Sequence, residues 1–543
     1  MNNYAELVTG VSDSQYVPQA GKEDLMGKNH SGAYIFKLDK WKRLNRFLII
    51  GVDNSTYYQS KKNLVKENYG CLTECLKEDF KRTVDTIVDV SVNARSPKND
   101  TAIFALAVAS LITRNLVEQE KSDRSYAYSK VKEVCRIGTH LFMYLTYMKE
   151  LKGNSTGAMG MGLQKAVRGY YNKKGLDALA MDTLKYRNRE GWTHKDVFRL
   201  SRFKGTTEQN QVVDYIMKGE CNMTQLPKVI EADIAIKACN DDVNLLIALI
   251  SEFGVPWEMI PTEYLTNKEV LRALIPSMGA TALIRNLSKL TSYEAIEDRS
   301  DCPHLKLVSE KLENEEYIKR GKVHPLQIAT ATLSYLSGTS KGGVTWRPYK
   351  RIVRALDAAF LHSFKNAEKL NINIDFALDV SGSMSWPQSE VNGIKASQLG
   401  CIMLSWLTKQ EDFTRVFTFS NTYQELTADF SNYRDMWTDI QKLSNFMSAT
   451  NCALPVINAL NEKRKVDLFI VWTDNETNSH HSGHASEYLK KYRKEVNPSA
   501  KMVVVGCTAT DCSIADPTDP GMMDVAGFDS SIAQIISSFV KGW

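Results

Sequence analysis

The sequence is poor in the features that would place it outside the soluble globular class. It contains no apolar run of the roughly 18 residues that a membrane-spanning helix needs. Its 30 glycines and 14 prolines are too few for a disordered or fibrous chain. The first residues, MNNYAELVTGVSDSQ, show no basic segment followed by an apolar core, so we expect no secretory signal.

Cysteine usage gives no sign of a disulfide scaffold. The ten cysteines include no CxxC pair, and Cys71 and Cys75 are the most closely spaced. We therefore expect reduced, mostly buried cysteines in a protein of the cytoplasm, or of the cytoplasm and nucleus. The 543 residues, 43% of them hydrophobic, are enough for at least two domains, each with its own core.

Several catalytic signatures are also missing. The sequence has no GxxxxGK[ST] phosphate loop, no GxGxxG dinucleotide motif and no GxSxG nucleophile turn. We find no base or second metal that could support phosphate chemistry. The sequence therefore predicts a protein that is not an enzyme.

Charge is divided unevenly along the chain. Residues 371–543 carry 14 Lys and Arg against 20 Asp and Glu, whereas residues 1–370 carry 54 against 43. An excess of positive charge in one part of a chain indicates an anionic partner for that part. Many solvated helices carry excess lysine, so this observation needs support from motifs.

The first part of the chain is predicted to be helical. Residues 1–30 are polar, and we expect a loose N-terminal arm. Residues 31–370 show helical patterning, with an Ala-rich segment at 101–113 and a second apolar segment at 242–253. Residues 267–290 indicate two helices broken between Pro276 and Gly279. Many helices joined by short breaks are typical of stacked helix pairs of the HEAT kind, although no clean repeat period is present.

The pattern changes near residue 371. Four short runs rich in branched apolar residues occur at 372–380, 415–420, 466–473 and 501–507, with helical segments between them. Continuous apolar strands that alternate with helices predict a parallel sheet covered on both faces. Residues 371–543 should form a doubly wound α/β domain, in which ligands bind at the carboxyl ends of the strands.

Oxygen-bearing side chains follow two of these strands. Asp379, Ser381 and Ser383 form an Asp-x-Ser-x-Ser turn after the first strand, and Asp474 follows the strand at 466–473. Thr450 lies in a loop before a predicted helix. Such a set of carboxylates and hydroxyls suits a hard divalent cation, and Mg²⁺ in particular. The alternative is a strand-to-helix turn with a serine cap, which would account for the first segment alone.

This set resembles the metal-ion-dependent adhesion site of von Willebrand factor A domains, and the resemblance covers about residues 371–543. It implies that Ser381, Ser383 and Thr450 ligate the metal directly or through water, and that Asp379 and Asp474 act mostly through water. A carboxylate from a protein partner could then complete the metal's shell. His480, His481 and His484 form an HHxxH pattern, which we interpret as a solvated loop and not a transition-metal site.

The densest cationic run covers residues 165–204, where basic residues are interleaved with Tyr170, Tyr171, Tyr186, Trp192 and Phe203. Cations that meet phosphates and rings that stack on unpaired bases are typical of RNA binding. The alternative is a set of amphipathic helices with lysines outward and aromatic side chains inward. The candidate RNA-binding residues from this run are Lys173, Lys174, Lys185, Arg187 and Arg199, whereas His194, taken alone, is more typical of a structural histidine.

Other segments resemble the 60 kDa SS-A/Ro ribonucleoprotein family, in which an RNA-binding TROVE domain precedes a von Willebrand A-like domain. They are KRLNRFL at 42–48, KVKEVCRIGTH at 130–140, GWTHKDVFRLS, TALIRNLSKL, TWRPYKRIVRALDAAF, TDNET at 473–477 and IADPTDPGMMDVAGFD at 514–529. The resemblance runs from about Lys40 onward. Residues 153–161 depart from the family because they contain no basic residue.

The resemblance implies a specific function. HEAT-like helices would form a ring that the A domain closes, the outer surface would hold a small non-coding Y RNA, and the hole would take the 3′ end of misfolded RNA. On the family pattern Arg136 and His140 join Lys165, Arg168, His194 and Lys195 as RNA contacts. We therefore expect a monomeric ribonucleoprotein component in RNA quality control, with one Mg²⁺.

Two rival functions remain open at this point. The chain could be a metal-dependent protein-interaction scaffold whose helices bind protein, because HEAT-type repeats often do so. It could also be an RNA-processing hydrolase, which would require a base or a second metal beside the phosphate.

Overall fold

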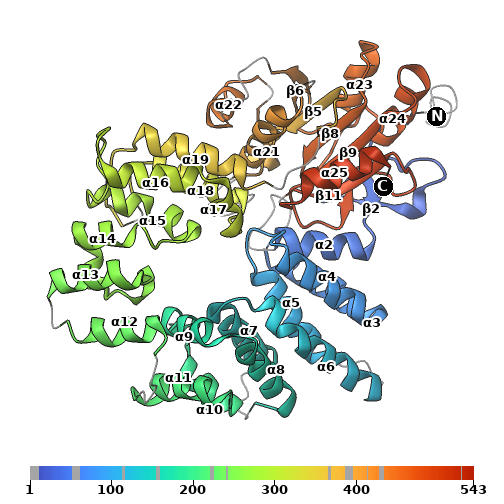
Figure 1. Ribbon diagram of the computed structural model, residues 1–543. Helices are drawn as coiled ribbons and strands as arrows, with labels where there is room; N and C mark the ends of the chain where they lie inside the picture. The colour runs from blue at the N-terminus through green and yellow to red at the C-terminus, as the bar shows by residue number, and fades with distance from the viewer. Residues whose placement is uncertain are drawn as a thin grey trace. The chain divides into compact units, whose positions relative to one another are not determined.

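The computed structural model describes residues 11–51, 61–112, 117–153, 159–220, 226–239, 242–340, 342–364, 369–385, 395–412, 414–426, 433–444, 446–527 and 529–542. The chain divides into two compact units (Figure 1). The A unit comprises residues 1–75, 95–97 and 365–543, and the helical unit comprises residues 76–94 and 98–364. Among the described residues, no helix is long and apolar enough to cross a bilayer.

The helical unit is built from amphipathic and apolar helices, as the sequence predicts. Each helix packs mainly on neighbours that are close in sequence, such as α4 on α5 and α6, α5 on α7, and α6 on α8. Its helices are α4 (Phe80–Val92), α5 (Asp100–Leu111), α6 (Val117–Val134), α7 (Gly138–Leu151), α8 (Met161–Asn172), α9 (Leu176–Lys185), α10 (His194–Ser201), α11 (Thr207–Lys218), α12 (Lys228–Lys237), α13 (Val243–Phe253), α14 (Lys268–Leu274), α15 (Ala280–Ser292), α16 (Pro303–Glu313), α17 (Glu315–Arg320), α18 (Pro325–Leu336) and α19 (Lys350–His362).

Short elements connect these helices. A two-stranded hairpin, β3 (Asn188–Arg189) with β4 (Trp192–Thr193), leads into α10, and the 3₁₀ turns η2 (Trp257–Met259) and η3 (Thr262–Thr266) lead into α14. The predicted break in residues 267–290 is confirmed, since α14 ends at Leu274 and α15 begins at Ala280. Local caps define such ends: Thr193 and Asp196 form a capping box at the start of α10.

The A unit contains the predicted α/β fold. Its sheet has the order β11-β9-β8-β5-β6-β7, in which every neighbouring pair is parallel except β6 with β7. The strands are β5 (Ile374–Asp379), β6 (Thr414–Phe419), β7 (Tyr423–Glu425), β8 (Leu468–Thr473), β9 (Lys501–Gly506) and β11 (Met522–Ala526). The helices that follow and cover them are α20 (Gly382–Ser385), α21 (Ala396–Gln410), α22 (Tyr433–Ile440), α23 (Leu454–Asn461), α24 (Ala485–Glu495) and α25 (Ile532–Lys541).

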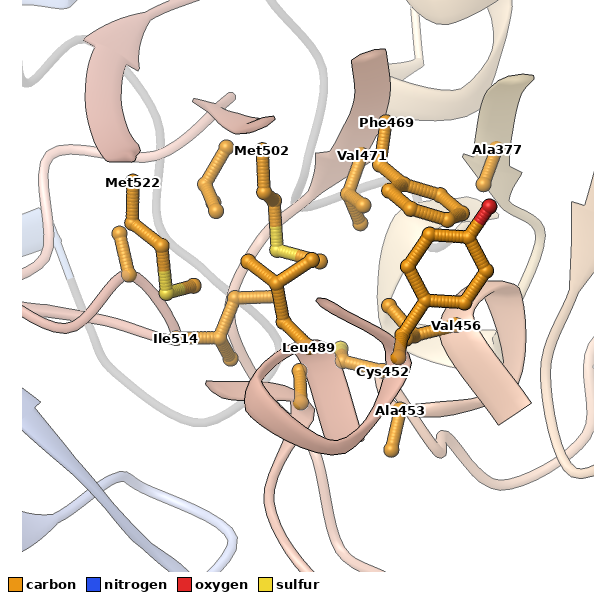
Figure 2. Close-up of a cluster of buried hydrophobic side chains, with 14 of the residues drawn as sticks. Ala377, Cys452, Ala453, Val456, Phe469, Val471, Leu489, Met502, Ile514 and Met522 are labelled. Atoms are coloured by element: carbon orange, nitrogen blue, oxygen red, sulfur yellow. The ribbon is translucent and has the colours of Figure 1, made fainter. Parts of the chain in front are cut away.

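One face of this sheet forms a core with α23 and α24. Figure 2 shows Phe469 and Val471 of β8 and Met502 of β9 facing Val456 of α23 and Leu489 of α24. All six residues of β5 and of β8 are buried, which explains why these strands are continuous apolar runs in the sequence. The core fixes the strand ends at which the candidate metal residues lie.

The N-terminal segment differs from the predicted loose arm, because its described part packs within the A unit. It contributes η1 (Glu23–Leu25), β1 (Met26–Lys28), β2 (Tyr34–Lys37) and α2 (Lys40–Ile50), and β2 pairs with β10 (Cys512–Ser513). Arg46 of α2 is buried in an ion pair with Asp524 of β11. The last N-terminal helix, α3 (Lys61–Glu78), spans the sequence boundary between the two units. Several of these contacts, such as Lys37 with Cys512 and Arg46 with Asp524, join residues more than 400 positions apart in the chain, so no local pattern could reveal them.

Candidate functional site

The five candidate metal residues lie at the carboxyl ends of β5 and β8 and in the loop before α23. All five are buried, with exposed fractions between 0% for Asp379 and 6% for Ser383. Since β5 and β8 are neighbours in the sheet, their following residues are held at the same edge. The hydroxyl oxygens of Ser381 and Ser383 lie 3.3 Å apart.

Hydrogen bonds hold together the loops that carry the five candidate metal residues, which we call the metal loops: the turn at residues 379–383, the loop of Thr450 and the loop that follows β8 from Asp474. The main-chain N–H of Gly382 donates to the carbonyl of Ser448, and that of Met447 donates to the carbonyl of Val380. Thr450 and Asn478 exchange two hydrogen bonds, because the Thr450 N–H donates to Oδ1 of Asn478 and the Asn478 N–H donates to the Thr450 carbonyl. The loop that carries Thr450 is thus tied to both strand ends.

The two carboxylates are buried in an environment that opposes their ionisation. Burial raises the pKa of Asp379 to about 6, although the Ser381 N–H and the Thr473 hydroxyl donate to its oxygens at 2.9 and 2.7 Å. Burial, and next the negative charge of Asp379, raise the pKa of Asp474 well above its usual range. Two close, buried carboxylates beside three hydroxyls form an oxygen donor set that a divalent cation would satisfy.

The histidine pattern does not form a metal site among the residues that the structure describes. His484 Nε2 lies 2.8 Å from the carbonyl of Val17, and the His480 ring stacks on Tyr16 with 4.0 Å between centroids. The described chain contains no cluster of three or more His, Cys, Asp or Glu side chains that could hold a metal ion. The predicted solvated loop is only partly observed, because His480 and His481 are exposed whereas His484 is 5% exposed and is the N-cap of α24.

Sequence analysis missed the N-terminal side chains that contact the metal loops. Gln15 is 1% exposed, and its amide nitrogen donates to Asn451 Oδ1 at 2.9 Å and to the Gly483 carbonyl at 3.1 Å. Its amide oxygen accepts from the Thr477 hydroxyl at 2.6 Å and from the Ser479 N–H at 3.0 Å. Gln15 therefore connects the loop of Thr450 to the loop that follows Asp474.

Several predicted RNA-binding side chains are instead engaged with carboxylates. Arg187 pairs with Asp233, Lys174 lies 3.5 Å from Asp182, and Lys185 lies 3.7 Å from Glu258. Lys174 also lies over the ring of Tyr170, 4.4 Å from its centroid. The carboxylates partly offset these positive charges, so their share in an RNA surface is smaller than the cationic run suggests.

Other candidates have structural contacts. The Arg168 guanidinium donates to the Ser201 carbonyl at 2.7 Å and thus links α8 to α10. The Lys173 ammonium lies 3.4 Å from the Lys132 carbonyl. His140 and Arg136 are half-buried between α6 and α7, and burial, together with the charge of Arg136, lowers the pKa of His140 to about 3.

His194 belongs to the core of the helical unit. It is 2% exposed, its Nδ1 lies 2.8 Å from the Tyr171 hydroxyl, and burial lowers its pKa to about 4. Phe198 and Phe203 pack around Tyr171 with ring centroids within 5.2 Å. For these aromatic side chains the structure supports the alternative raised by the sequence, amphipathic helices whose aromatic side chains point inward, and not stacking on RNA bases.

Besides Lys173 and Arg187, three predicted side chains are exposed, and these three lie on neighbouring helices. Lys165 lies on α8, and Lys195 and Arg199 lie on α10, which packs against α8. On α6, Lys121 and Lys132 are also exposed. Sequence analysis missed these two residues because they lie outside the cationic run at 165–204. Within the described residues none of these five forms an ion pair. Residues 154–158, part of the segment that departs from the family, lie outside the described residues.

Comparison with known proteins gives matches over nearly the whole chain. The model of the TROVE domain matches residues 27–239 and 253–338, and the model of the Ro60 vWA domain matches residues 374–540. The chain is 31% identical over 522 residues to the RNA-binding protein RO60 of Deinococcus radiodurans, with 95% of each chain covered. It is 29% identical over 594 residues to the RNA-binding protein RO60 of Caenorhabditis elegans, covering 95% of this chain and 90% of the relative.

A solved structure has the same fold. The crystal structure of the Deinococcus radiodurans RO (RSR) protein matches with a TM-score of 0.66 and 29% sequence identity, covering 93% of this chain and 100% of that chain. The predicted fold class, a helical domain followed by a von Willebrand A-like domain, is thereby confirmed.

Proposed function

This chain belongs to the Ro60 family, whose TROVE domain precedes a von Willebrand A domain, and we propose that it binds RNA through its helical unit. Both relatives named above are RNA-binding proteins and neither is named for a catalytic activity, which agrees with the prediction that the chain is not an enzyme. Within RNA, we propose Y RNAs and the 3′ ends of misfolded small RNAs as ligands. Their binding would serve RNA quality control in the cytoplasm.

The observation that carries this proposal is the group of unpaired cations on α6, α8 and α10. Lys121, Lys132, Lys165, Lys195 and Arg199 are exposed on helices that pack in series, and no carboxylate among the described residues neutralises them. Phosphate contacts of this kind supply affinity without sequence specificity, and release of counterions makes the binding weaken with salt. A polyanion is the ligand that such a surface favours.

The test is RNA affinity as a function of salt. The full chain is titrated with a stem-loop that carries a single-stranded 3′ tail, beside the variants Lys165→Glu and Lys195→Glu. Each reversal should weaken binding and reduce the salt slope by about 0.7–0.9 for every phosphate that the variant no longer neutralises. Lys319→Glu is the matched control, because Lys319 is paired with Glu315 on α17 and the net charge change is the same. Equal losses of RNA affinity in all three variants would contradict a local RNA surface and would indicate only a general effect of net charge.

We propose further that the A unit binds one Mg²⁺. Ser381, Ser383 and Thr450 would hold the ion directly or through water, and Asp379 and Asp474 would act mostly through water. When bound, the ion supplies an electrophilic position that a carboxylate of a protein partner can occupy. The residues fit this role because they offer only oxygen donors, because they are buried, and because the two carboxylates lack a basic partner among the described residues.

A further inference from the structure

A pocket of about 410 Å³ lies between α6 and α8 in the helical unit. The described side chains that line it are Lys121, Arg124, Ser125, Tyr128, Ser129 and Lys132 of α6 and Lys165 and Ala166 of α8, with Gly162 and Gly169. Its volume is within the range of about 300–1,000 Å³ that small-molecule sites occupy. Four of the lining side chains are cationic and, among those described, none is acidic.

Two glycines on α8 keep this pocket open. A Cβ added to Gly162 would lie 2.8 Å from Cε2 of Tyr128, so a side chain there would displace the tyrosine ring. A Cβ added to Gly169 would have no heavy atom within 4 Å. Packing therefore does not explain the glycine at position 169. The choice is notable because glycine destabilises a helix interior relative to alanine. The unfilled space beside Gly169 is where a ligand can enter.

Tyr128 supplies an aromatic side wall in an otherwise cationic pocket. It is half-buried on α6, and burial raises the pKa of its hydroxyl, so the ring stays neutral. Neutral aromatic rings stack on nucleobases, whereas lysines beside them meet the phosphate groups. The ammonium groups of Lys121, Lys132 and Lys165 form no ion pair within the described chain, and all three lie on the pocket's lining.

We propose that this pocket binds one unpaired nucleotide, with its base against Tyr128 and its phosphate groups at Lys121, Lys132 and Lys165. The proposal rests on the proposed RNA-binding function and adds to it the place on the helical unit at which one unpaired nucleotide is held. The nucleotide could come from an RNA chain or from a free mononucleotide, since base and phosphate are common to both.

The test uses the full chain and two RNA probes, a blunt perfect duplex and the same duplex with a single-stranded 3′ tail. Tyr128→Ala should weaken binding of the tailed probe by roughly 5- to 140-fold, which is the range of one base stack, and leave binding of the blunt duplex unchanged. Tyr128→Phe keeps the ring and should bind both probes as the wild type does. Gly169→Leu should show the same selective loss because its side chain fills the pocket.

The control for added bulk is Asn172→Leu, which places the same side chain at an exposed position of α8 outside the pocket. Titration with adenosine monophosphate distinguishes the two sources. If the wild type binds it and Gly169→Leu does not, the pocket also accepts free nucleotide. If the wild type does not bind it, the pocket accepts a nucleotide only as part of RNA. Equal affinity of wild type, Tyr128→Ala and Gly169→Leu for the tailed probe would overturn the proposal.

Failure of the proposed function would look different. In that case the wild type would bind neither RNA probe, whereas the pocket proposal fails when the wild type binds RNA and the pocket variants bind it equally well. If the wild type binds neither RNA, the mononucleotide titration decides the pocket alone, and absence of binding there overturns it.

Discussion

Gln15 offers the sharpest test of how the N-terminal segment supports the candidate metal site. Replacing Gln15 with alanine removes four hydrogen bonds and leaves Asn451 Oδ1, the Thr477 hydroxyl and the Ser479 N–H without that partner. A buried polar group left unsatisfied costs about 1–3 kcal/mol. Ser479 is only half-buried and its N–H can be hydrated, so we expect a total loss of about 3 kcal/mol in the free energy of unfolding of the A unit.

This loss can be measured as a melting temperature. For a unit of this size, 1 kcal/mol corresponds to about 2–4 °C, so Gln15→Ala should melt about 6–12 °C below the wild type. The Thr450 and Asp474 loops also lose their common anchor. Removal of groups that orient metal ligands typically weakens metal binding by about 10- to 100-fold, and titration calorimetry with Mn²⁺ should show a loss of that order.

A matched control is present in the same segment. Gln19 is also buried, but its amide nitrogen donates to the Ser486 hydroxyl at 2.7 Å, at the start of α24 and away from the metal loops. Gln19→Ala should therefore lower the melting temperature and leave Mn²⁺ affinity unchanged. If Gln15→Ala and Gln19→Ala bind Mn²⁺ equally well, the N-terminal segment stabilises the A unit but does not position its metal loops.

Three further predictions concern single side chains. Asp379→Ala should abolish Mn²⁺ binding in calorimetry and leave RNA affinity unchanged, and loss of both activities would contradict their placement in different units. The melting temperature of the metal-free protein should change little, because relief of the repulsion from Asp474 offsets the hydrogen bonds lost from the Ser381 N–H and the Thr473 hydroxyl. His194 stays neutral in the fold with a pKa near 4, against about 6.5 when unfolded, so its contribution to stability is full above pH 6.5 and is lost as the pH falls toward 4. Urea unfolding should show that, between pH 7 and pH 5, the free energy of unfolding falls by about 2 kcal/mol less in His194→Gln than in the wild type. An equal fall in both proteins would mean that His194 does not titrate in this way. Gly400→Ala would place a Cβ 2.1 Å from Cδ1 of Leu378 and should cost about 1–3 kcal/mol by overpacking, whereas Gly169→Ala, which meets open space, should not destabilise the protein in the same melting assay.

The parts of the fold that could be predicted are those whose cause is local. Residues 374–379 and 468–473 are buried on both faces, so their apolar runs identify them as strands of a parallel sheet. The strand β7 was missed because its three residues are only half-buried or exposed and carry no such run. The strand β11, MMDVA, was missed because an aspartate interrupts its apolar pattern.

Side-chain roles that depend on distant partners could not be predicted. Arg187 and Lys195 look equivalent in the sequence, yet Arg187 pairs with Asp233 and Lys195 remains exposed without a partner among the described residues. Gln15 is one polar residue in a polar segment, and its partners lie more than 400 residues away. Residue type and spacing establish which groups carry charge, but only the fold establishes which charges are already neutralised.

Uncompensated charge is the property that both candidate sites share. A buried charge needs a partner because taking it from water alone is costly, whereas an exposed charge is solvated and stays available to a ligand. In the A unit, Asp379 and Asp474 are buried together with no basic partner among the described residues, which favours a small cation as ligand. In the helical unit, Lys165 and Lys195 are exposed on neighbouring helices and form no ion pair among the described residues, which favours a polyanion. Charge without a partner therefore supports both proposals, a metal ion for the A unit and RNA for the helical unit, and Arg187 supports neither because it pairs with Asp233.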